Sequence, residues 1–132
     1  MIYLADVRDW LKSYNIAEHC YIGKLDNKNE KSIGVYPRKG DMKIALGGID
    51  NTKTAIKRVS ILLHWNKNAN ETERRATELQ EAILNTKSLT LNDKKVNYIR
   101  LLYEEPIDVG TDDSGVYERV IEMDIYYERR RT

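Results

Sequence analysis

The stretch TAIKRVSILLHWNKNANETERRATELQEAI, residues 54–83, predicts one long strand followed by one helix. Apolar side chains occupy every odd position from Val59 to Trp65, whereas the even positions are mixed. Successive side chains of a strand point to opposite faces, so this alternation is typical of a strand with one face on a core. We therefore expect a strand over residues 54–66, with His64 on the mixed face and at the protein surface.

The second half of the stretch indicates an amphipathic helix. Asn70 can cap its start, and Glu73 stands three residues later, in the position of a capping box. The apolar stripe that follows consists of Thr72, Ala76, Leu79 and Ile83. The charged positions, expected to be solvated, are Glu71, Arg74, Arg75, Glu78 and Glu81. An apolar stripe is stable only when it is covered, so the helix should lie on a sheet that contains the strand.

The flanking segments predict a further helix and more strands. Apolar side chains recur every three or four residues over residues 3–14, which predicts a first helix with Trp10 as a core anchor. Further strands are predicted over residues 18–24, 32–36, 87–91, 94–103 and 117–127. Asn92 and Asp93 form a candidate hairpin turn. Residues 108–115 are expected to form a polar loop, and the charged tail, residues 128–132, is expected to fray.

These elements predict the α+β fold class. Short turns between several strands favour antiparallel pairing. We expect a mostly antiparallel sheet with two helices packed on it, forming a single domain over residues 1–132.

Composition narrows the class of protein. The chain has 132 residues, of which 41% are apolar and 33% charged, as in an ordinary globular domain. Its single cysteine, Cys20, cannot form an internal disulfide, which fits a reducing compartment. We expect neither a signal peptide nor a membrane span, because no suitable apolar run occurs. The net charge of +1 predicts neither a nucleic-acid nor a membrane partner.

The segment between the second and third predicted strands, residues 38–53, shows no usable period. It carries three glycines and a small apolar island, Met42-Lys43-Ile44-Ala45-Leu46. Loops of this length are uncommon in compact domains, so the segment is either functional or disordered. Gly47-Gly48 does not match a phosphate-binding loop, because the Walker spacing and its Lys-Ser/Thr pair are missing.

No catalytic, metal or cofactor site is predicted. His19 and Cys20 are adjacent in a predicted strand, so their side chains point to opposite faces and cannot readily share an ion. The acidic residues near Asp108, Asp112 and Asp113 could bind a divalent ion, but a solvated acidic loop explains them better. A nucleophile arrangement of the Cys–His or Ser–His type stays an open alternative, since the sequence does not exclude one and no local signature supports one.

Three segments give the chain a family resemblance. The first is VRDWL at residues 7–11, followed by CYIGKL at residues 20–25. The second is SIGVYP at residues 32–37, which leads through a glycine-containing loop into the long strand and the NETE helix start. The third is EPIDVGTDDSGVY at residues 105–117, before the last strand. In this order and spacing, the chain resembles the tail-terminator proteins of long-tailed bacteriophages, often labelled minor capsid proteins.

The resemblance implies a structural virion protein without enzymatic activity. Such subunits assemble as a six-membered ring on the last ring of the tail tube, stop its growth and offer a docking face to the head. The implied partners are other copies of the chain, the tail tube protein and the head connector protein. Neither a membrane nor a sequence-specific nucleic acid is implied. The expected location is the head–tail junction of the virion, after synthesis in the cytoplasm of the bacterial host.

The resemblance also suggests where subunits meet. In relatives, the long loop between the second and third strands lies at subunit contacts or in the lumen, and here this loop corresponds to residues 38–53. Exposed apolar islands usually mark contact sites, so we expect Met42, Ile44 and Leu46 to contact the next subunit. Two alternatives stay open: another head–tail connector or tail-completion subunit, and a small metal-dependent nuclease that uses Asp108, Asp112 and Asp113.

Overall fold

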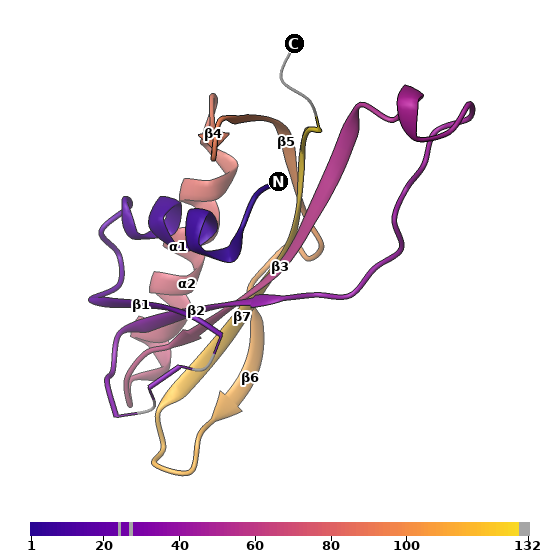
Figure 1. Ribbon diagram of the computed structural model, residues 1–132. Coiled ribbons are helices and arrows are strands. Elements are labelled where there is room, and N and C mark those ends of the chain that lie inside the picture. The colour runs from indigo at the N-terminus through magenta and orange to yellow at the C-terminus, as the bar shows by residue number, and fades with distance from the viewer. Residues whose placement is uncertain (24, 27, 130–132) are drawn as a thin grey trace.

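The computed structural model describes residues 1–23, 25–26 and 28–129 of the chain (Figure 1). Lys24, the predicted end of the first short strand, lies outside the described residues, and so do residues 130–132 of the charged tail. Neither described helix is long and apolar enough to cross a membrane.

Two helices lie on one side of a seven-stranded sheet (Figure 1). The helices are α1 (Leu4–Lys12) and α2 (Ala69–Leu84), and a short 3-10 turn, η1, spans Ile49–Asn51. The strands are β1 (His19–Ile22), β2 (Ser32–Pro37), β3 (Thr54–His64), β4 (Thr90–Leu91), β5 (Lys94–Leu101), β6 (Ile107–Thr111) and β7 (Tyr117–Glu128). Their order is β1-β2-β3-β7-β5-β4, and β6 also pairs with β7. Only the β1–β2 pair is parallel among the described strands, which confirms a mostly antiparallel α+β fold.

The centre of the sheet is the β3–β7 pair. The two strands are paired along the whole of β3, from Thr54 opposite Glu128 to His64 opposite Glu118. The predicted apolar face of β3 is confirmed, because Val59, Ile61, Leu63 and Trp65 are all buried. The helix stripe is confirmed as well, since Ala76, Leu79 and Ile83 are buried in the same core. The apolar face of β3 and the apolar stripe of α2 therefore pack together in one core.

The start of α2 differs from the prediction. The side chain of Asn68, not Asn70, caps the helix and accepts the backbone N–H of Glu71 at 3.1 Å. Asn68 is held in this role because its own N–H donates to the side chain of Asn66 at 3.0 Å, in the turn after β3. The helix consequently begins at Ala69, and the capping box predicted between Asn70 and Glu73 is wrong.

Three further local predictions can be compared with the structure. The first helix is shorter than residues 3–14, but Trp10 is buried as expected and its indole N–H donates to the Tyr14 hydroxyl at 2.8 Å. The hairpin turn is confirmed, because Asn92 and Asp93 have φ angles of 48° and 61° between β4 and β5. Residues 108–115 are not all loop, since β6 pairs with β7 up to Thr111. Gly110, at φ 85°, accommodates a register shift in this pairing, and the shift interrupts the alternation by which a strand is predicted from sequence.

Candidate subunit contact site

Residues 38–53 form an arm that leaves the end of β2, projects from the body of the protein and returns at the start of β3 (Figure 1). The turn η1 lies near its tip. Pro37 at the end of β2 pairs with Val59, so the arm leaves the sheet part-way along β3 and returns at the start of that strand, Thr54. The sheet therefore provides a rigid base from which the arm extends.

The base of the arm is fixed by a partly buried network of charges. The backbone N–H of Arg38 donates to the carbonyl of Arg58 at 3.1 Å, which continues the pairing of β2 with β3. Arg38 Nη1 donates to Asp124 Oδ1 at 2.8 Å and to the Met123 carbonyl at 3.1 Å. Arg38 Nε lies 3.1 Å from Glu122 Oε2. The side chain of Asp124 is only 6% exposed, so this carboxylate needs the guanidinium beside it.

The tip of the arm is a compact turn closed by Thr52. Its hydroxyl donates to the carbonyl of Gly48 at 2.9 Å and accepts the backbone N–H of Ala45 at 2.9 Å. Gly47 and Gly48 have φ angles of 100° and 87°, which favour glycine and allow the chain to reverse. Thr52 is itself buried, with 6% of its surface exposed. The tip thus has its own hydrogen bonds and holds the apolar residues around it in place.

Between base and tip, the arm carries apolar side chains in solvent. Met42 is 58% exposed, Ile44 55% and Leu46 101%. Ile49, which the sequence interpretation did not single out, is 44% exposed and belongs to the same surface; its place directly after the glycine pair was the available signal. Within the described part of the chain, no backbone hydrogen bond joins residues 39–44 to any other segment. Apolar side chains and unpaired backbone on a projecting segment are typical of a contact surface.

The chain also matches a known protein family. The family model described as bacteriophage tail terminator protein matches residues 3–129. The chain belongs to this family. No curated protein matches it significantly. Membership in the tail terminator family makes the chain a structural component of a bacteriophage virion, as the resemblance of its segments implied.

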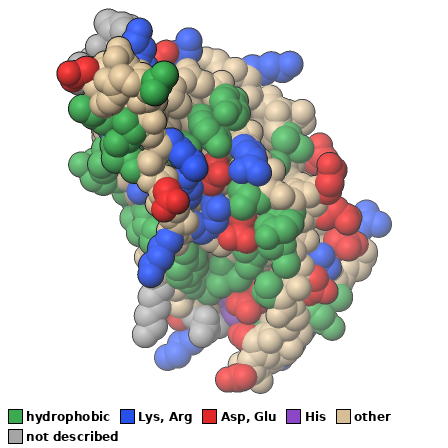
Figure 2. Space-filling view, turned by 90° about the vertical axis from the view of Figure 1, so that its right-hand side faces the viewer, with side chains coloured by type: hydrophobic (Ala, Val, Ile, Leu, Met, Phe, Trp, Pro, Cys, Tyr) green, Lys and Arg blue, Asp and Glu red, His purple; other side chains and the backbone are tan. Residues whose placement is uncertain are grey.

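The sheet face opposite the helices is the second notable surface of this tail terminator. Figure 2 shows Lys and Arg side chains interleaved with Asp and Glu near the centre of the view. Arg100 Nη1 lies 3.6 Å from Asp124 Oδ2, so Asp124 is shared between Arg38 and Arg100. Beside them, the rings of Tyr98 and Tyr126 stack with centroids 4.3 Å apart. Neither α1 nor α2 covers this face, so a partner can contact its charges and aromatic rings.

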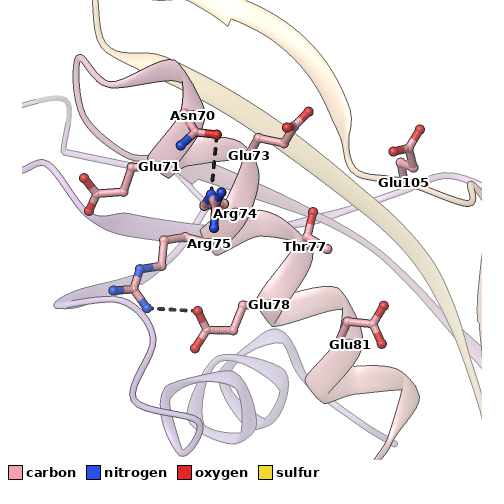
Figure 3. Close-up of a pocket in the computed structure, with 9 residues that line it drawn as sticks. All are labelled: Asn70, Glu71, Glu73, Arg74, Arg75, Thr77, Glu78, Glu81 and Glu105. Atoms are coloured by element: carbon pink, nitrogen blue, oxygen red, sulfur yellow. Dashed lines mark hydrogen bonds and ion pairs between the residues drawn. The ribbon is translucent and has the colours of Figure 1, made fainter.

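The outer side of α2 is a third surface, lined by charged and polar side chains. Figure 3 shows its side chains directed away from the sheet around a hollow of about 670 Å³. Arg75 Nη1 donates to Glu78 Oε2 at 2.9 Å, and Arg74 Nε donates to Asn70 Oδ1 at 3.4 Å. As predicted, these positions are largely exposed; only Glu71 is half-buried. The paired charges make this hollow an ordinary solvated helix face.

Among the described residues, the acidic residues of the nuclease alternative form no group of three that could hold a metal ion. Asp108 lies in β6, where its carboxylate accepts the N–H of Gly110 at 2.9 Å. Asp112 accepts the backbone N–H groups of Val116 and Ser114, both at 2.9 Å. These bonds, with Val116 contributing most, hold the pKa of Asp112 below its ordinary value. Both carboxylates thus organise the β6–β7 turn.

His64 is buried, which corrects the prediction that it lies at the surface. Its Nδ1 is 3.0 Å from Glu118 Oε2 and 3.8 Å from Asp112 Oδ2. The pairing of β3 with β7 places Glu118 opposite His64, and the turn from β6 into β7 brings Asp112 to the same ring.

The His19–Cys20 pair forms no metal site in the described residues, where no group of three His, Cys, Asp or Glu side chains could hold an ion. Cys20 is half-buried, and burial raises the pKa of its thiol.

Proposed function

We propose that the protein caps the bacteriophage tail tube as a ring of subunits, six by family analogy, and thereby ends tube polymerisation. One face of the ring contacts the tail tube protein and the other receives the head connector protein at the head–tail junction. The function requires surface complementarity and no catalysis, membrane or base-specific contact with nucleic acid. The observation that carries the proposal is the arm, whose apolar side chains project into solvent from a fixed base.

Met42, Ile44 and Leu46 supply the contact to the next subunit in this proposal. Full burial of each such side chain contributes about 1.5–3 kcal/mol. Association also costs conformational entropy, and an arm already fixed at its base and tip loses less on binding. In this proposal the arm of one copy contacts the body of the next, a heterologous contact, and such contacts close into a ring when the rotation between neighbouring copies closes.

The experiment compares capping by the wild type and by a variant carrying both Ile44→Asp and Leu46→Asp. We expect the variant to keep its circular dichroism spectrum, because both side chains are exposed, but to leave purified tube ends uncapped and tails overlong. Val109→Asp is the matched control, since Val109 is 48% exposed on β6, away from the arm. Electron microscopy of tail lengths gives the readout.

The outcomes separate the arm from the function itself. A double variant that still caps tails at normal length would show that the arm is not the ring contact. A wild-type protein that binds head connectors but never tube ends would instead favour the alternative of a head–tail connector subunit.

A further inference from the structure

Strand β5 has an unpaired outer edge. One edge of β5 pairs with β7, from Val96 to Leu101. On the other edge, β4 covers only Lys94 and Lys95, and a last hydrogen bond joins the N–H of Val96 to the carbonyl of Leu89 at 3.0 Å. Among the described strands, none pairs with this edge over residues 97–101. Such an edge is a template for an added strand.

An apolar groove runs beside this free edge. It has a volume of about 210 Å³ and lies between the end of α2, the segment that follows it and β5. Its apolar lining includes Ile83, Leu84, Leu89, Val96 and Ile99. Leu84, on the last turn of α2, is 57% exposed. The groove therefore offers apolar surface on the helix side of the unpaired strand edge.

The arm has the pattern of a strand that would fit there. Met42, Ile44 and Leu46 alternate with Lys43 and Ala45, so in an extended conformation the three apolar side chains point to one side. The backbone of residues 39–44 makes no hydrogen bond within the described chain, so its donors and acceptors are available for pairing. Seven residues, 40–46, span roughly 23 Å, enough to follow the roughly 17 Å edge of residues 97–101.

The open face beside this edge carries charge. On β5, Ile99 faces the core, whereas Arg100 points to the open face, where its side chain is 61% exposed. If Ile44 lies in the groove, the odd-numbered side chains of the extended arm point to that open face. Asp41 and Lys43, both exposed, then lie on that side, and of the two only Asp41 is opposite in charge to Arg100.

We propose that the arm of one copy adds a strand to the free edge of β5 in the next copy, with Met42, Ile44 and Leu46 lying in the groove beside Leu84. This inference rests on the proposed ring and names the surface that receives the arm. Backbone pairing would supply affinity and the groove would select the register, as in other strand additions. Because donor and acceptor are different surfaces, each copy can both give and receive an arm.

Disulfide trapping tests the pairing directly. Two proteins are made in a Cys20→Ser background, one with Ile44→Cys and one, of a different mass, with Leu84→Cys. After mild oxidation at high concentration with tube ends present, we expect a dimer that contains one chain of each kind. Absence of this mixed dimer overturns the proposal, and so does efficient pairing of Ile44→Cys with itself, which would indicate a symmetric contact.

Surface variants separate this inference from the proposed function. Leu84→Asp should abolish ring formation and leave circular dichroism unchanged, whereas Ile22→Asp, at 39% exposure on the opposite sheet edge β1, should leave rings intact. If Leu84→Asp and Leu89→Glu both assemble and cap tails like the wild type, the groove is not the acceptor, although the capping function stands. If the wild type caps no tube ends but the mixed dimer still forms, the arm contact stands and the capping function fails.

Discussion

Arg38 and Asp124 stand 86 residues apart in the sequence, and the Arg38 guanidinium donates to the Asp124 carboxylate at 2.8 Å. The contact joins the first residue of the arm to the strand at the centre of the sheet. Their side chains are 19% and 6% exposed, so neither charge can be rehydrated fully if the other is lost. The position of the arm is thereby coupled to the stability of the sheet.

Removing the Arg38 charge should destabilise the whole fold. Arg38→Met keeps an unbranched side chain but leaves the buried Asp124 without its nearest cation, and we expect the free energy of unfolding to fall by about 3 kcal/mol. The value lies at the low end for buried pairs because Arg100 remains 3.6 Å from Asp124. Urea unfolding followed by tryptophan fluorescence gives the measurement.

The control for this prediction is Arg8→Met. Arg8 lies 3.1 Å from Asp9, but the two side chains are 34% and 67% exposed. Exposed pairs contribute less than about 1 kcal/mol. Equal losses in the two variants would contradict the role of burial at the arm base.

The stripe of α2 should respond to truncation according to burial. Leu79 is fully buried on the sheet, so Leu79→Ala should lower the free energy of unfolding by about 2–5 kcal/mol. Leu84→Ala, at a 57% exposed position of the same helix, should cost far less. Thermal melts of the two variants give the comparison, and a Leu79→Ala melt that matches the wild type would show that the stripe does not support the core.

Hydrogen exchange should divide the arm into two parts. In the free protein, amides of residues 39–44 should exchange fast, because they have no partner in the described chain. The tip amides of Gly48, Asn51 and Thr52 donate to backbone carbonyls and should exchange more slowly. In the assembled ring, residues 39–44 should become protected. Strong and equal protection of residues 39–44 in isolated monomer and ring would contradict the arm contact.

Acidification should remove the contribution of the Asp112 carboxylate to the stability of the fold. Its folded pKa is lowered, so the ionised carboxylate stabilises the fold above the unfolded pKa of about 3.9, and this contribution is lost as the pH falls through the folded pKa. Asp112→Asn lacks the charge and should lose less stability than the wild type on acidification below about pH 4.

Asp113→Asn provides the comparison for this acid response. It removes a charge one residue away and leaves the backbone bonds to Asp112 in place. Urea titrations over a range of pH measure the effect. Parallel acid profiles for wild type and Asp112→Asn would show that the carboxylate does not stabilise the turn.

The parts of the fold that depend on local patterns were predictable. The alternation from Val59 to Trp65 and the stripe through Leu79 each reflect contacts that repeat along one element, and both predictions are confirmed. The cap at Asn68 was missed because two nearby asparagines can serve, and only the turn at Asn66 decides between them. A local pattern thus identifies an element more firmly than it identifies the element's first residue.

The remaining features depend on residues far apart in the chain. Strand β6 is short and contains Gly110, so its own sequence shows no alternation. It is a strand because it pairs with β7. The contact of His64 with Glu118, 54 residues away, follows instead from the pairing of β3 with β7. The apolar island of the arm was visible in the sequence. The fixed base of the arm was not, because no pattern near Arg38 indicates its contact with Asp124. Whether Met42, Ile44 and Leu46 contact another subunit stays a prediction.

The central position of β7 has a consequence for synthesis of the protein on the ribosome. β7 follows the other strands in the chain, yet β3 is joined to β5 and β6 only through it. A nascent chain that ends before Tyr117 has the apolar face of β3 and the stripe of α2 but lacks the strand that connects them to the rest of the sheet. The sheet can therefore close only after translation of residue 128, and every copy emerges with unsatisfied strand edges. Chaperone binding, or slow translation of residues 117–128, would act on this interval.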